Sequence, residues 1–232
     1  MTPAKVKILF AFFVYSGNGG IAMQLPQITT WFASLFKKMH NDPRIAEIAV
    51  RQFGDVPLTM ERNRVIATAL EGGYDVIVML DSDNIPDMYL GHTADAKPFF
   101  DTSFDFTYDR LMRGVPSVVC APYCGPPPHP VNGGEENVYV FYPETPENNS
   151  KHPHFAFKGY SRTHAAQMRG IQEIAAGPTG VIMMSTSAPL LMPVRKQTQT
   201  DILEDFKAGK IDRDRCARLM NMQSWFFYEF TN

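Results

Sequence analysis

Short apolar runs alternate along the chain with longer segments in which apolar residues recur every three or four positions. The apolar runs are too short for typical globular helices, so they predict strands, and the unbroken run Val76–Leu80 predicts one that is buried on both faces of a sheet. These runs are Val6–Tyr15, Val76–Leu80, Val115–Ala121 and Val181–Met184. Ile45–Phe53 alternates well enough for a further strand, and Val138–Tyr142 is expected to form one strand of a β-hairpin. The segments with helical spacing are Leu25–His40, Met60–Glu71, Phe99–Arg113, Thr200–Lys207 and Asp212–Met222.

Glycines and prolines mark the ends of these predicted elements. Gly72 and Gly73 stop the second helix, Gly114 stops the third, and Gly209 separates the last two. The proline run within residues 122–128 predicts an extended loop, because proline cannot join a central ladder. Strands and helices that alternate in this way predict an α/β fold.

Composition and charge are those of an ordinary globular protein. A length of 232 residues suits one large α/β domain or two small ones, and we expect a single domain over residues 1–232. Charged residues make up 20% of the chain and hydrophobic residues 44%, so disorder is not predicted. The formal net charge of −2 gives no support to a broad nucleic-acid-binding surface, and any contact with DNA must be local.

The cysteines and the N-terminus bear on the expected location. Three cysteines without Cys-x-x-Cys spacing predict neither a disulfide framework nor a zinc site, so a reducing, cytoplasmic environment is expected. Lys5 and Lys7 followed by Ile8–Tyr15 loosely imitate a signal peptide, but the short run without a clear cleavage site fits a buried first strand better. No run approaches the length needed to span a bilayer.

Two carboxylates follow the most apolar of the predicted strands. Asp81 and Asp83 flank Ser82, and side chains at positions i and i+2 of an extended backbone point to the same side. They can therefore close on one cation, and carboxylate oxygens favour Mg²⁺ or Mn²⁺, which usually bind phosphate oxygens as well. The sequence thus predicts a site for a diphosphate. The alternative is a solvated turn in which Asp83 caps the residues that follow it.

A basic residue lies at the predicted start of the preceding helix. Thr59 is a plausible N-cap, which would place Arg62 and Asn63 in the first turn. Free N–H groups at a helix N-terminus attract anions, and an arginine can add a forked contact to phosphate. The alternative is that Arg62 forms a surface ion pair with Glu61 or Asp55.

An apolar strand that ends in Asp-x-Asp, preceded by a helix that opens with Arg62 and Asn63, resembles the nucleotide-sugar-binding half of a GT-A fold glycosyltransferase. The resemblance covers about Lys5 to Gly180 in element order, and it implies a GT-A, Rossmann-like, mixed but mostly parallel sheet flanked by helices. It implies a nucleotide-sugar-binding half over about residues 1–115 and an acceptor-side half over about 116–232. In that family, Asp-x-Asp holds a divalent metal against the diphosphate of a UDP- or GDP-sugar, and we favour UDP here.

The resemblance also implies roles for individual residues. Val14 and Tyr15, at the end of the first strand, would line the nucleotide base. The remaining donor contacts would come from Arg62, Asn63, Asp81, Ser82 and Asp83, with Asp81 and Asp83 holding Mn²⁺ or Mg²⁺. The acceptor side would include Tyr123, Gly177, Thr179 and Gly180, the last three from a small-residue turn before a strand. Asp83 would act in catalysis by holding the metal that neutralises the leaving group.

The chain departs from the family pattern near its end. Members of the family commonly carry a catalytic carboxylate after an aromatic stretch, and here residues 225–230 look like that stretch before the sequence stops at Asn232. Three alternatives stay open: the chain is truncated, Glu229 is the base, or the enzyme retains configuration by another route. The compact form resembles GT-A enzymes of phages and large viruses, which suggests a glycan or a modified DNA base as acceptor and, if viral, a host cytoplasmic location.

Three rival functions share parts of this pattern. A sugar-nucleotidyltransferase would share the metal and the sheet, but its Gly-rich basic loop is replaced here by residues 16–20, Ser-Gly-Asn-Gly-Gly. A non-catalytic sugar-nucleotide- or glycan-binding module would keep Asp81 and Asp83 without a base. A haloacid-dehalogenase-type phosphatase also has Asp-x-Asp, but after its first strand, whereas here the motif comes later in the chain.

Overall fold

The computed structural model describes residues 4–14, 26–54, 58–82, 84–87, 97–121, 137–141, 159–161, 170–174, 177, 179–191 and 199–221. In chain order, the elements in these ranges are β1 (Val6–Val14), α1 (Pro26–His40), β2 (Ile45–Gly54), α2 (Leu58–Glu71), β3 (Val76–Asp81), α3 (Phe99–Met112), β4 (Val118–Cys120), β5 (Asn137–Phe141), β6 (Gly159–Ser161), β7 (Val181–Ser185), α6 (Ser187–Leu191), α7 (Gln199–Lys207) and α8 (Arg213–Asn221).

Five strands form one mixed sheet in the order β2-β1-β3-β7-β4. β1 is parallel to both β2 and β3, whereas β7 is antiparallel to both β3 and β4. β2, β1, β3 and β4 therefore run in one direction, and β7 runs in the opposite direction. This confirms the predicted α/β class with a mixed but mostly parallel sheet. β3 lies in the middle of the sheet, and Val76–Leu80 are each at most 2% exposed, as their unbroken apolar run predicts. β5 pairs with β6 in a separate antiparallel sheet, and the sequence predicted only the first of these two strands.

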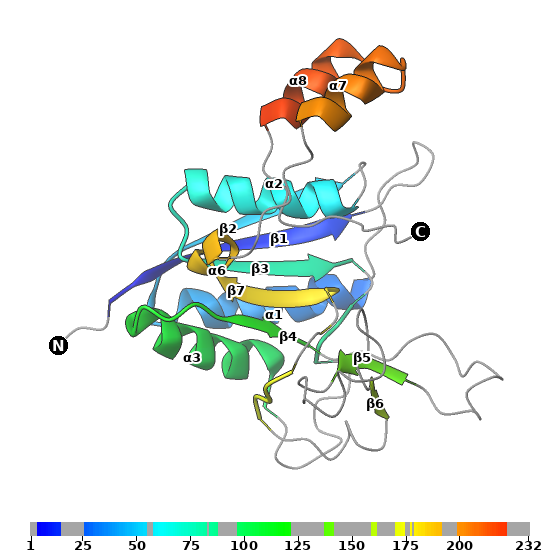
Figure 1. Ribbon diagram of the computed structural model, residues 1–232. Helices are drawn as coiled ribbons and strands as arrows, with labels where there is room; N and C mark the ends of the chain where they lie inside the picture. The colour runs from blue at the N-terminus through cyan, green and yellow to red at the C-terminus, as the bar shows by residue number, and fades with distance from the viewer. Residues whose placement is uncertain are drawn as a thin grey trace.

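Helices cover both faces of the five-stranded sheet (Figure 1), with α2 on one face and α1 and α3 on the other. Alternate residues of β1 divide between these two faces, as the period of a strand requires. One cluster of buried side chains joins Phe10 and Phe12 of β1 to α1 and α3. A second cluster joins Leu9 and Ala11 of β1 to α2. The result is a three-layer arrangement whose core lies on both sides of β1 and β3.

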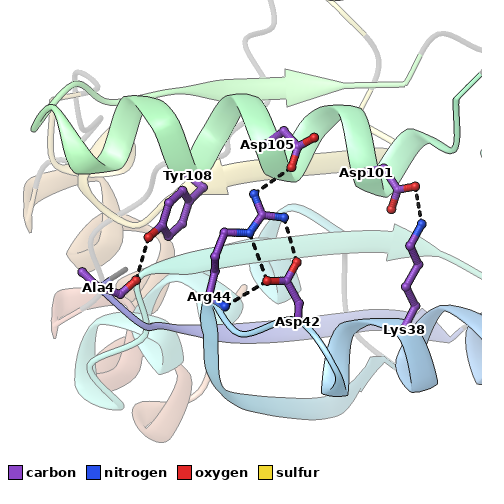
Figure 2. Close-up of polar contacts among 7 residues, drawn as sticks. All are labelled: Ala4, Lys38, Asp42, Arg44, Asp101, Asp105 and Tyr108. Carbon is purple, nitrogen blue, oxygen red and sulfur yellow. Dashed lines mark hydrogen bonds and ion pairs between the residues drawn. The ribbon is translucent and has the colours of Figure 1, made fainter. Parts of the chain in front are cut away.

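Polar contacts connect α3 to the turn between α1 and β2 (Figure 2). The Arg44 guanidinium lies between two carboxylates, with Nη2 2.7 Å from Asp42 Oδ2 and Nη1 2.7 Å from Asp105 Oδ1. Its central carbon lies 4.7 Å from the centre of the Phe104 ring, so the cation also covers an aromatic face. The Arg44 side chain holds the pKa of Asp42 below its ordinary value, chiefly through side-chain hydrogen bonds. These contacts fix the helical layer that includes α3.

The predicted helix ends are largely confirmed, and α2 shows why. The N–H of Tyr74 donates to Ala69 O at 3.0 Å and the N–H of Gly73 donates to Leu70 O at 3.3 Å, which is the hydrogen-bond pattern of a Schellman motif. Gly73 has φ of 62°, a conformation that glycine adopts without steric cost. The helix therefore stops where the glycine pair predicts.

The predicted start of α2 is wrong by two residues. The helix begins at Leu58, so Thr59 lies inside it and is not the N-cap. Leu58 packs against the core cluster beneath α2, and this apolar contact extends the helix past the predicted polar start. Arg62 is consequently the fifth helical residue and lies in the second turn, not the first.

Three further sequence predictions need correction. The strand predicted over Val115–Ala121 is only β4, because the Val115 N–H donates to Arg110 O in the helix end and Pro116 has no N–H for a ladder. Phe36, one of the apolar residues of the helix predicted over Leu25–His40, is 36% exposed and stacks on His40, so it does not join the core as its helical spacing suggested. The short helix α6 was not predicted, because it has five residues and shows too little of a helical period.

Candidate functional site

The carboxyl ends of the parallel strands bring several of the predicted site residues to one edge of the sheet. β1, β2 and β3 end at Val14, Gly54 and Asp81, and the antiparallel β7 begins at the same edge. The Asp81 N–H donates to Gly180 O at 2.8 Å. The Ser82 N–H donates to the carbonyl of Phe13 at 3.1 Å. The backbone around Asp81 and Ser82 is thus tied to β1 and to the turn before β7. Open α/β sheets bind their ligands at this edge.

The side chain of Arg62 reaches this edge from α2. Its Nη2 atom lies 3.2 Å from Asp81 Oδ1 and 3.4 Å from Asp81 Oδ2, and it also donates to Thr179 O at 3.0 Å. The guanidinium carbon lies 5.5 Å from the centre of the Phe13 ring. One arginine therefore contacts the ends of two strands and the turn before a third.

Burial strengthens the electrostatics of this contact. The side chain of Arg62 is 6% exposed and that of Asp81 is 23% exposed, so the carboxylate faces solvent more than its partner does. The interaction of opposite charges grows as water is excluded. Solvent accordingly has more access to Asp81 than to Arg62.

The surface ion pair that was the alternative role for Arg62 is formed by its neighbour Arg64. Arg64 Nη1 donates to Glu61 Oε1 at 2.7 Å, and the Arg64 side chain is 61% exposed. Glu61 itself is 1% exposed, and its Oε2 atom is buried with no hydrogen-bond partner among the described residues. Asn63 is also buried, at 3% exposure. Its predicted role in donor binding stays a prediction.

The predicted acceptor-side turn packs tightly against β4. A Cβ atom at Gly177 would lie 2.2 Å from Cys120 Sγ and 2.9 Å from Ile174 Cδ1, so only glycine fits there without a shift. Burial raises the pKa of the Cys120 thiol. Thr179 contributes its carbonyl to Arg62, and Gly180 contributes its carbonyl to the N–H of Asp81. Gly180 is thus bonded to the backbone of Asp81, and Thr179 is bonded to the side chain of Arg62. That these residues also face an acceptor stays a prediction.

Val14 lies at the same edge but mainly fills the core. It is 9% exposed and belongs to the cluster under α1 and α3. Its carbonyl oxygen would lie 2.1 Å from a Cβ at Gly54, so the ends of β1 and β2 approach each other closely. Contact between Val14 and a nucleotide base stays a prediction.

Asp87 is a structural residue that the sequence did not single out. Its Oδ2 accepts a hydrogen bond from Trp31 Nε1 at 2.7 Å, and its Oδ1 accepts one from the Phe99 N–H at 2.7 Å. Pro98, at the N-cap of α3, makes no side-chain capping hydrogen bond, so a distant carboxylate caps this helix. Asp87 thereby joins the segment after Asp81 to α1 and α3. A helix preceded by proline, which has no capping side chain, was the available signal.

Four predicted site residues lie outside the described ranges: Tyr15, Asp83, Tyr123 and Glu229. The same holds for every histidine except His40, which lies on α1. Among the described residues, no group of three or more histidine, cysteine, aspartate or glutamate side chains could hold a metal ion. Asp81 supplies a partly exposed carboxylate at this edge of the sheet, and its oxygens suit Mg²⁺ or Mn²⁺. Carboxylate oxygen is a donor that fits these ions, and the joint binding of a metal by Asp81 and Asp83 stays a prediction.

Comparison with family models, curated proteins and solved structures gives no match to this chain. Its classification therefore rests on its own architecture, an α/β protein with a five-stranded mixed sheet. Within the described ranges, no helix has the length and apolar character required to cross a membrane.

Proposed function

We propose that the chain is a metal-dependent glycosyltransferase that moves a sugar from a nucleoside-diphosphate sugar, with UDP favoured over GDP, to an acceptor hydroxyl. The observation that carries the proposal is the contact between Arg62 and Asp81 at the carboxyl edge of the parallel strands. It places a carboxylate suited to a divalent cation beside a guanidinium suited to phosphate oxygens. The acceptor would be a glycan or a modified base of DNA.

Each residue at this edge has a chemical task in the proposed reaction. Asp81 and Asp83 would hold Mn²⁺ or Mg²⁺, which when bound neutralises charge that develops on the departing diphosphate. Arg62 would bind the phosphate oxygens and stabilise the same charge, most strongly in the transition state. The turn that contains Thr179 and Gly180 would border the sugar and the acceptor. Glu229 is the proposed base for an inverting reaction.

A ligand screen tests this function. UDP, GDP, CDP and ADP are added to the protein with and without Mn²⁺, and the melting temperature is measured. Binding at about 100 times the Kd stabilises a protein by about 2.7 kcal/mol, so a matching diphosphate should raise the melting temperature by several degrees. The proposal predicts that the increase requires Mn²⁺ and is largest for UDP. No metal-dependent stabilisation by any diphosphate would contradict it.

Turnover separates a transferase from the alternatives. The protein is incubated with Mn²⁺ and UDP-sugars, and release of UDP is followed, first with water and then with glycan or DNA acceptors. Release of UDP supports the transferase. Stabilisation by Mn²⁺ and UDP without any release would instead indicate a non-catalytic sugar-nucleotide-binding module. Formation of a nucleotide sugar from a nucleoside triphosphate and a sugar phosphate would indicate a nucleotidyltransferase.

A further inference from the structure

The two charges at the candidate site neutralise each other in the absence of ligand. Arg62 Nη2 lies 3.2 Å from Asp81 Oδ1, and the arginine is almost completely buried, with 6% of its side chain exposed. In the proposed function, Arg62 binds the phosphate oxygens and Asp81 binds the cation. Each incoming ligand must therefore take a group that already has a partner of opposite charge.

Either ligand alone meets an electrostatic obstacle. A divalent cation that binds Asp81 takes the counter-charge away from Arg62 and places a second positive charge beside a buried one. A diphosphate that binds Arg62 without a cation brings negative charge beside Asp81 and draws the guanidinium away from it. We expect each ligand to bind weakly by itself for this reason.

We propose that the Arg62–Asp81 ion pair is exchanged as a unit for a cation–diphosphate pair, so that Asp81 passes to the cation as Arg62 passes to the phosphate oxygens. This inference rests on the proposed function. The exchange conserves charge, since a divalent cation and the dianionic diphosphate of a sugar nucleotide are neutral together. Thr179 O, which accepts a hydrogen bond from the same Nη2, gives Arg62 a contact that does not depend on Asp81.

A thermodynamic consequence follows from the exchange. The cation and the diphosphate must bind cooperatively, and each must raise the affinity of the other by the same factor. Because Arg62 contacts Asp81, its charge contributes to the factor by which the cation and the diphosphate raise each other's affinity. A neutral side chain at position 62 should improve binding of the cation alone, because the competing positive charge is gone, and should weaken the cooperativity.

Electron paramagnetic resonance of free Mn²⁺ measures the exchange without enzyme turnover. Mn²⁺ is titrated into wild-type protein, Arg62→Gln and Arg64→Gln, each with and without UDP. The affinity of UDP for Mn²⁺ in solution is the same for the three proteins, and a titration without protein measures it so that it can be subtracted. Arg64 is the matched control, because it lies on the same helix, is exposed, and pairs with Glu61.

The proposal predicts that UDP raises the Mn²⁺ affinity of the wild type and of Arg64→Gln by about tenfold or more. In Arg62→Gln, Mn²⁺ alone should bind about threefold tighter than to the wild type, and the effect of UDP should fall by about fivefold. Cooperative binding that is unchanged in Arg62→Gln would overturn the exchange and leave the proposed function standing. Wild-type protein that binds no Mn²⁺ and UDP together would overturn both.

A second variant, Asp81→Asn, tests the exchange if Arg62→Gln does not fold. Asp81→Asn keeps the shape of the side chain and removes the charge that repels a metal-free diphosphate. Equilibrium dialysis of UDP in the presence of a chelator should give an affinity about fivefold higher for Asp81→Asn than for the wild type. An equal or lower affinity would overturn the exchange.

Discussion

Arg62 and Asp81 are 19 residues apart in the sequence, and their side chains meet with Nη2 3.2 Å from Oδ1. The first lies on α2 and the second at the end of β3, so the contact connects a helix to the centre of the sheet. The carboxylate is the more exposed partner, and in the proposed function it is the group that binds the cation. Its contributions to stability and to binding can be measured separately.

Replacement of Arg62 should destabilise the fold. Arg62→Met removes the counter-charge of Asp81 and the hydrogen bond to Thr179 O, and we expect a loss of about 2 kcal/mol in the free energy of unfolding. Urea denaturation measures it. The matched control is Arg113→Met, because Arg113 forms an exposed pair with Asp109, with side-chain exposures of 73% and 69%. That variant should change stability by no more than about 0.5 kcal/mol. Equal effects of the two variants would contradict the structural role of Arg62.

The fit between Gly177 and Cys120 predicts a pair of coupled mutations. Gly177→Ala should lower the free energy of unfolding by about 1–3 kcal/mol, because its Cβ would lie 2.2 Å from Cys120 Sγ. Cys120→Ala removes that sulfur, so the double variant should be more stable than the sum of the two single effects, by about 1 kcal/mol. Urea denaturation of the four proteins completes the cycle. Additive changes in the free energy of unfolding would show that a side chain at position 177 does not clash with Cys120.

Asp87 is predicted to hold the segment after Asp81 in place. Asp87→Ala leaves Trp31 Nε1 and the Phe99 N–H without their acceptor, which should lower the free energy of unfolding by about 2 kcal/mol. Asp109→Ala removes an exposed carboxylate from α3 and should have an effect of no more than about 0.5 kcal/mol. Denaturation followed by circular dichroism compares the two variants. A neutral Asp87→Ala would refute this role.

The Arg44–Asp42 pair predicts a pH-dependent term in stability. Since hydrogen bonds from Arg44 lower the native pKa of Asp42 below the ordinary 3.8, the ionised carboxylate stabilises the fold above that value. The contribution is lost as the pH falls through the lowered native pKa. Asp42→Asn should therefore cost about 1 kcal/mol at about pH 6, and less at about pH 3. Urea midpoints at the two pH values measure the difference, and a pH-independent cost would contradict the assignment.

Much of the fold follows from local patterns in the sequence. β3 was predictable because a continuous apolar run lies between turn signals, and the structure buries all of it except the terminal Asp81. The C-terminal ends of α2 and α3 were predictable because glycines adopt φ values near 65° there. The start of α2 and the length of β4 were not predictable from local patterns. Leu58 packs against the core, and the Val115 N–H bonds to the end of the preceding helix.

The candidate site was predictable only at the level of residue types. Arg62 and Asp81 stood out because their chemistry suits phosphate and metal, and the structure brings them together. The hydrogen bond from Arg62 to Thr179 O joins residues 117 apart, and the contact with Phe13 also depends on how α2 lies on the sheet. Such contacts leave no local signal, because they arise from the packing of distant segments.

The most direct test of the account is an isothermal titration of UDP in Mn²⁺ into wild-type protein and Asp81→Asn, with a metal-free titration of each as reference. If Asp81 holds a cation that in turn holds a diphosphate, Mn²⁺ should raise the UDP affinity of the wild type by about tenfold or more. In Asp81→Asn, the same addition of Mn²⁺ should have little effect. An equal enhancement in both proteins, or no binding of UDP to the wild type under either condition, would contradict the central claim.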